Sequence, residues 1–146
     1  MYVDQESLKQ LGWADILTVL GGVIQTDRGR KHVESLVPCT ELREVEWRFA
    51  IQAELHWLSE TESLTLDISG ATEVGPLVRR AEKGGLLDGL EVRACARVLE
   101  TFQAVKSIGE RWVEHMPNVA ALAGELVRAP SLVFQIHEAI EPSGEL

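Results

Sequence analysis

Two groups of basic side chains are the residues of this sequence best suited to bind a charged ligand. The first lies in a short predicted helix, and the second lies at the end of a later predicted helix. The first group consists of Arg28, Arg30 and Lys31, and the second of Arg79, Arg80 and Lys83. Lysine and arginine neutralise nucleic-acid phosphates, so both groups are candidate phosphate contacts. The second group has a simpler interpretation as well, because cations near a helix C-terminus interact favourably with the helix dipole.

No pattern of catalytic, cofactor-binding or metal-binding residues accompanies these groups. The chain lacks the Gly-x-x-x-x-Gly-Lys-Ser/Thr motif that cradles nucleotide phosphates. None of its four histidines is spaced as a metal ligand with another histidine or a cysteine. Cys39 and Cys95 lie far apart, and Cys95 falls on an apolar helix stripe, which predicts a buried free thiol. Gly84-Gly85 precedes a helix start that could attract an anion, but Asp88 already supplies a carboxylate there, so we interpret the pair as a turn.

Charge and composition narrow the class of protein. The 146 residues carry a formal net charge of −9, and duplex DNA repels an acidic body, so we expect weak, salt-sensitive DNA binding at most. Hydrophobic residues make up 45% and charged residues 25%, as in a soluble globular domain. The apolar stretches are short and interrupted by charges, and the N-terminus has no apolar signal region. These features predict a cytoplasmic protein without membrane contact.

The apolar residues recur at helical spacing throughout, which predicts an all-α protein, an orthogonal bundle of about six or seven helices in a single domain over residues 1–146. Side chains that cap or start helices mark most of the expected boundaries. The expected helix starts are near Leu8, Thr26, Thr40, Pro76, Asp88, Pro117 and Pro130, with an interruption of the first helix at Gly12. Residues 63–74 are expected to connect two helices, with a short extended piece.

The expected helix over residues 41–60 is apolar on two sides. One stripe is spaced for a core and consists of Leu42, Val45, Phe49 and Ala53. The second stripe consists of Trp47, Ile51, Leu55 and Leu58. A helix of this kind is either central in its own domain or shared with a partner. Both interpretations remain open for the second stripe, and we favour self-association with a second copy.

Several segments, in order, resemble one family, the second bacterial MutS lineage, here called MutS-two. The most specific segment runs from Arg80-Ala81-Glu82 through Gly84-Gly85 to Leu87. The other segments are Leu11–Leu17, Thr26–Arg30, Leu36–Thr40 and Ala139–Glu145. The chain departs from the family pattern at residues 66–74. The resemblance covers essentially the whole chain.

The resemblance implies the N-terminal part of a larger cytoplasmic, dimeric ATPase that lacks the mismatch-reading domain of repair MutS. It implies ATP, a divalent metal ion and commonly an endonuclease domain, all in parts beyond this chain. The family acts on branched DNA and suppresses homologous recombination, and some members rescue stalled ribosomes. We therefore expect a noncatalytic scaffold and dimerisation module. The alternative is a stand-alone helical adaptor that binds proteins.

Overall fold

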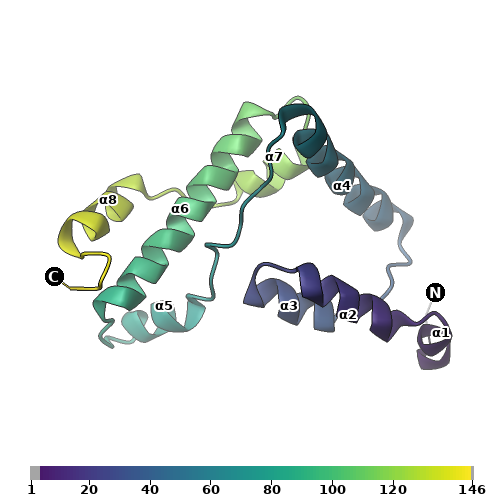
Figure 1. The fold of residues 1–146 in the computed structure, drawn as a ribbon, viewed down its shortest axis with the longest axis horizontal. Helices are drawn as coiled ribbons and strands as arrows, with labels where there is room; N and C mark the ends of the chain where they lie inside the picture. The colour runs from purple at the N-terminus through teal and green to yellow at the C-terminus, as the bar shows by residue number, and fades with distance from the viewer. Residues whose placement is uncertain (1–3, 146) are drawn as a thin grey trace. The chain divides into compact units, whose positions relative to one another are not determined.

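In the computed structural model, which describes residues 4–145, the regular secondary structure is entirely α-helical (Figure 1). The described helices are α1 (Gln5–Gln10), α2 (Trp13–Val23), α3 (Asp27–Glu34), α4 (Leu42–Glu62), α5 (Gly75–Glu82), α6 (Gly89–Arg111), α7 (Pro117–Gly124) and α8 (Pro130–Ala139). The all-α prediction is confirmed. The eight helices described exceed the expected six or seven, because the first stretch divides at Gly12, whose φ of 63° lies in the left-handed region.

Local capping chemistry sets the helix starts that the sequence predicted. The Thr26 hydroxyl accepts a hydrogen bond from the Gly29 N–H (3.1 Å) at the start of α3. Asp88 and Glu91 form a reciprocal capping box at the start of α6. Prolines occupy the first turn of α5, α7 and α8, where a missing N–H has no cost.

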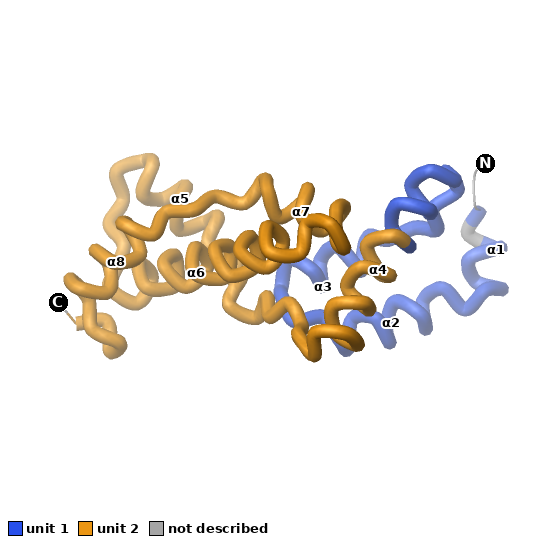
Figure 2. The backbone as a smooth tube through the Cα atoms, turned by 90° about the horizontal axis from the view of Figure 1, so that it is seen from above, with its two compact units in different colours: residues 1–49 blue, residues 50–146 orange. Residues whose placement is uncertain are grey.

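The chain separates into two compact units, Met1–Phe49 and Ala50–Leu146, with the division inside α4 (Figure 2). In the first unit α2 packs against α1 and α3. The indole N–H of Trp13 donates to the Leu36 carbonyl (3.0 Å), which ties the start of α2 to the segment after α3. Val33 is the one buried side chain among the described residues of this unit, so its apolar core is small.

The second unit has a larger core, built on both ends of α6. At one end Leu58, Met116 and Val119 are buried together, with Ile51, Trp57, Leu66, Ile108 and Trp112 packed around them. At the other end Ala96, Ile136 and Ile140 form a second cluster with Val92. The connection over residues 63–74 contains neither helix nor strand, and its Leu66 anchors it to the first cluster.

The buried face of α4 differs from the predicted core stripe. Leu42 and Phe49 are 69% and 65% exposed, Ala53 is also exposed, and only Val45 is half-buried. Leu58 of the second stripe is completely buried, and Ile51 packs against its cluster. The assignment of the first stripe to the core was wrong, because residues of α6 and α7 pack against Ile51 and Leu58 of the second stripe instead.

A charged residue on this buried face holds α7 in place. Glu54 is 8% exposed, and its carboxylate accepts hydrogen bonds from the Asn118 N–H (3.1 Å), the Asn118 side-chain amide (2.6 Å) and the Val119 N–H (2.8 Å). The capping position, Met116, has no side-chain oxygen to do this. A negative charge at a helix N-terminus also meets the positive end of the dipole. Glu54 therefore supplies from α4 the cap that α7 lacks.

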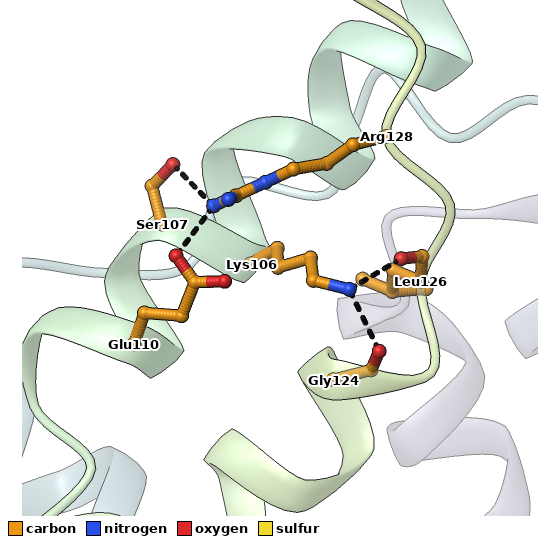
Figure 3. Close-up of polar contacts among 6 residues, drawn as sticks. All are labelled: Lys106, Ser107, Glu110, Gly124, Leu126 and Arg128. Atoms are coloured by element: carbon orange, nitrogen blue, oxygen red, sulfur yellow. Dashed lines mark hydrogen bonds and ion pairs between the residues drawn. The ribbon is translucent and has the colours of Figure 1, made fainter.

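The opposite end of α7 is held by a cation from α6 (Figure 3). The Lys106 ammonium donates to the carbonyls of Gly124 (2.7 Å) and Leu126 (2.9 Å), which lie at and beyond the helix C-terminus. Arg128 then ties the next loop to α6 through the Glu110 carboxylate (2.7 Å) and the Ser107 hydroxyl (3.2 Å). Both ends of α7 thus receive the charge that its dipole favours.

A glycine allows α6 and α7 to approach closely. A Cβ added at the buried Gly109 would lie 2.9 Å from the Ala123 Cβ and 3.2 Å from the Ala120 Cα. These atoms belong to the α7 backbone or are attached directly to it, so they cannot move without shifting the helix. Gly109 is therefore a packing requirement of the second unit.

We predict that Glu54→Ala lowers the free energy of unfolding by about 2–4 kcal/mol, because the buried N–H of Val119 and the half-buried N–H of Asn118 lose their acceptor. Glu60→Ala is the matched control, because Glu60 lies on the same helix and is exposed. It should change stability by less than about 0.5 kcal/mol. Urea unfolding followed by circular dichroism measures both variants. Equal effects would contradict the capping role.

We predict that Gly109→Ala destabilises the second unit by about 1–3 kcal/mol, because overpacking outweighs the gain in helix propensity. Gly124→Ala is the control, since an added Cβ there has no atom within 4 Å. The control should be neutral or stabilise by up to about 1 kcal/mol. The melting temperatures of the two variants test this prediction. A higher melting temperature for Gly109→Ala than for the parent would show that α6 and α7 do not pack this closely.

Candidate nucleic-acid interface

The first basic group lies on α3, and only one of its three cationic side chains forms an ion pair within the described residues. Arg30 pairs with Asp27 (3.1 Å) and also donates to the Ile24 carbonyl (3.3 Å). Arg28 and Lys31 are exposed and take part in no ion pair among the described residues. Two positive charges therefore remain for a phosphate ligand on this helix.

The second basic group lies at the end of α5 and is also partly engaged within the chain. Arg80 forms an ion pair with Glu91 of α6. Arg79 and Lys83 are exposed and form no ion pair within residues 4–145. The two basic groups belong to different units, so each can be assessed only as a separate patch of two unpaired cations.

The turn between α5 and α6 has the geometry of a helix-terminating glycine motif. The Gly84 N–H donates to the Ala81 carbonyl and the Gly85 N–H to the Arg80 carbonyl, both at 2.9 Å. Gly84 has φ of 79°, which favours glycine, and a Cβ on Gly85 would lie 2.9 Å from the Arg80 carbonyl oxygen. Both glycines are thus required by the turn, which confirms the interpretation made from the sequence.

Carboxylates fill the helix N-terminus that follows this turn. Asp88 accepts from the Glu91 N–H (2.9 Å), and Glu91 accepts from the Asp88 N–H (3.0 Å). The Arg80 guanidinium, followed by the Asp88 N–H, holds the pKa of Glu91 below its usual range. A phosphate would meet two negative charges here, so these residues do not fit a nucleotide. Among residues 4–145 no group of three or more His, Cys, Asp or Glu side chains could hold a metal ion.

The remaining groups with possible chemistry take part in packing or in single contacts. The His115 ring stacks on Trp57 with centroids 4.5 Å apart, and His137 contacts the Glu100 carboxylate (2.7 Å). Cys95 is half-buried, and burial raises the pKa of its thiol, which disfavours the nucleophilic thiolate.

Within the described part of the chain, every helix is too short or too polar to span a lipid bilayer.

The four residues of the predicted self-association stripe have separate locations. Leu58 is a core residue and Ile51 packs against it, whereas Trp47 and Leu55 are exposed. The sequence analysis missed the charged residues that link helices, Glu54 and Lys106. Glu54 could have been detected as a carboxylate on an apolar stripe, between Ile51 and Leu58.

Comparison with known proteins gives one consistent result. Endonuclease MutS2 of Anaeromyxobacter sp. is 30% identical over 138 residues, which cover 94% of this chain and 17% of that protein. Endonuclease MutS2 of Symbiobacterium thermophilum is 30% identical over 144 residues, 99% of this chain and 18% of the relative. This chain resembles the N-terminal region of MutS2.

A third MutS2 endonuclease, from Thermomicrobium roseum, is 26% identical over 97% of this chain and 18% of its own length. The chain thus spans less than a fifth of the length of these MutS2 relatives. No family model matches the chain, and no solved structure matches it. The MutS2 resemblance that the motifs predicted is confirmed.

We predict that Glu91→Gln reduces the loss of stability on acidification. The folded-state pKa of Glu91 is depressed, so its contribution is present above the unfolded-state pKa and is lost as the pH falls through the folded-state value. Melting temperatures between about pH 6 and about pH 3 should therefore fall less steeply in the variant than in the parent. Glu82→Gln, near the same turn, is the control and should follow the parent. The prediction would be contradicted if the melting temperature of Glu91→Gln fell with pH as steeply as that of the parent.

Proposed function

We propose that this chain is a noncatalytic helical scaffold module of a MutS2-like protein. The observation that carries the proposal is the match to MutS2 endonucleases over 94–99% of the chain and less than a fifth of the relatives. The charged groups that link elements of the second unit support it. Glu54, Lys106 and Glu91 each fix the end of a helix, which is a structural use of charge.

The activities of the whole protein belong to the same proposal. We place ATP binding, the divalent metal ion and endonuclease activity in parts outside these 146 residues, because the residues described above do not fit a nucleotide or a metal ion. Binding of branched DNA, suppression of recombination, contact with ribosomal RNA in ribosome rescue, homodimerisation and a cytoplasmic location are proposed for that protein as a whole.

The second candidate, a stand-alone adaptor that binds proteins, is favoured by the apolar side chains exposed on α2 and α4. The genomic reading frame separates the two candidates. Several hundred further codons with a Walker motif are expected for the scaffold module. A stop codon directly after Leu146 would support the adaptor instead.

Direct DNA contact by this chain should be weak, because each basic group offers only two cations without an ion pair. Two phosphate contacts predict that affinity falls about tenfold between about 50 and 200 mM salt. Arg79→Glu combined with Lys83→Glu should remove the contribution of the α5 patch. Lys9→Glu combined with Arg43→Glu changes the charge equally at exposed positions of the first unit and serves as the control.

Fluorescence anisotropy with a labelled branched DNA measures this binding, and the same samples with Mg²⁺ or Mn²⁺ test for cleavage. We expect no cleavage and no submicromolar binding at physiological salt. Submicromolar binding that is lost in the α5 double variant would show an autonomous DNA site. Metal-dependent cleavage that one carboxylate substitution abolishes would contradict a noncatalytic module.

A further inference from the structure

Two leucines at the corner between α5 and α6 are exposed in a turn whose other residues have a structural role. Leu86 is 91% exposed, the largest value among the exposed large apolar residues described, and Leu90 is 59% exposed. The turn requires Gly84 and Gly85, and the charges beside it belong to the capping box and its ion pair. These contacts account for the glycines and the charges, but not for an apolar side chain at position 86.

The segment after α8 returns to this same corner of the second unit. The Arg93 guanidinium of α6 donates to the Ile140 carbonyl (2.6 Å). A Cβ on Gly89 would collide with the Gly144 carbonyl, and a Cβ on Gly144 would lie 3.2 Å from the Leu90 backbone nitrogen. Two glycines therefore bring the backbone of this segment directly against the first turn of α6.

Backbone hydrogen bonds fix the course of the chain at this contact. The Gly144 N–H donates to the Glu141 carbonyl (2.9 Å), and the Glu141 N–H donates to the Glu145 carbonyl (2.8 Å). Gly144 has φ of 88°, a value that favours glycine. The segment thus forms a closed turn, and Glu145 lies one residue beyond the contact between Gly144 and Leu90.

We propose that, in the longer protein, the segment that follows Leu146 packs apolar side chains onto Leu86 and Leu90. The proposal rests on the scaffold role and names the surface through which this module joins the next part of the same chain. The four residues from Leu86 to Leu90 span at most about 14 Å, which about five extended or about ten helical residues also span. The first residues after Leu146 therefore reach both leucines, and the removal of apolar surface from water favours the contact.

The exposed apolar residues near the other end of α6 lack this argument. Val127 is 62% exposed, and Lys106 and Arg128 hold its loop to α6. Along the helix axis, Lys106 lies about 24 Å from Leu90. A segment that continues from Gly144 starts beside Leu90, so Val127 marks a surface that the same residues should not cover.

Site-specific photo-cross-linking of the full-length protein tests the proposal. With p-benzoylphenylalanine at position 86, we expect links within one chain to about the first fifteen residues after Leu146, mapped by mass spectrometry. The same probe at position 127 is the matched control and should not link to these residues. Mixing isotope-labelled and unlabelled protein separates links within one chain from links between two copies.

The substitution Leu86→Glu gives an independent measurement. In the full-length protein it should speed hydrogen exchange of the segment after Leu146 at least about tenfold, because a charge replaces the apolar contact. In the 146-residue chain it should leave the melting temperature unchanged, since Leu86 is exposed there. Val127→Glu is the control and should not alter exchange of that segment.

Links from position 86 only to residues 4–49, only between copies, or to nothing after Leu146 would each overturn the proposal. Unchanged exchange in Leu86→Glu would do so as well. A stop codon directly after Leu146 would overturn the scaffold role and this proposal together. A long reading frame without the expected links would overturn this proposal alone.

Discussion

The second unit depends on one buried charge, the carboxylate of Glu54 at the start of α7. An isolated helix of eight residues is not stable in water, and α7 has no cap of its own. Glu54 satisfies its first N–H groups from one side, and Lys106 satisfies its last carbonyls from the other. Because Met116 and Val119 lie at the start of this helix, the cluster that they form with Leu58 assembles only where α4 delivers both the leucine and the carboxylate.

The same use of charge recurs at the other helix ends of this unit. Arg93 of α6 donates to the carbonyl of Ile140, directly after α8 (2.6 Å), and Arg80 of α5 pairs with the capping residue Glu91. These two arginines and Lys106 are occupied by the fold and are not available for an external phosphate. These charges hold the helices of the second unit in place, as the proposed scaffold role requires. Each basic group keeps only two cations outside ion pairs among the described residues, and the chain carries a net charge of −9, which is consistent with the weak DNA binding expected from the sequence.

The helix starts could be predicted from the sequence, because residues close in the chain determine them. The buried face of α4 and the ion pairs between helices could not, because residues distant in the chain determine them. Thr26, Asp88 and the helix-starting prolines act within one turn of chain, so the helix starts were predicted correctly. The basic residues named from the sequence remain candidate phosphate contacts, and the pairing of Arg80 with Glu91 could not be predicted, because it depends on the fold of the α5–α6 turn. The choice between the two stripes of α4 depends on Met116 and Val119, about sixty residues later. Nothing local in the sequence marks which stripe those residues will cover.

The buried cap at Glu54 also has a consequence for backbone amide exchange. The first N–H groups of a helix have no partner within the helix and normally exchange quickly with solvent. Those of Asn118 and Val119 are bound to a carboxylate on another helix instead. Their exchange therefore requires α7 to separate from α4, an event that also opens the cluster around Leu58. The start of this short helix consequently reports the opening of the cluster around Leu58, whereas the start of an ordinary surface helix reports only local fraying.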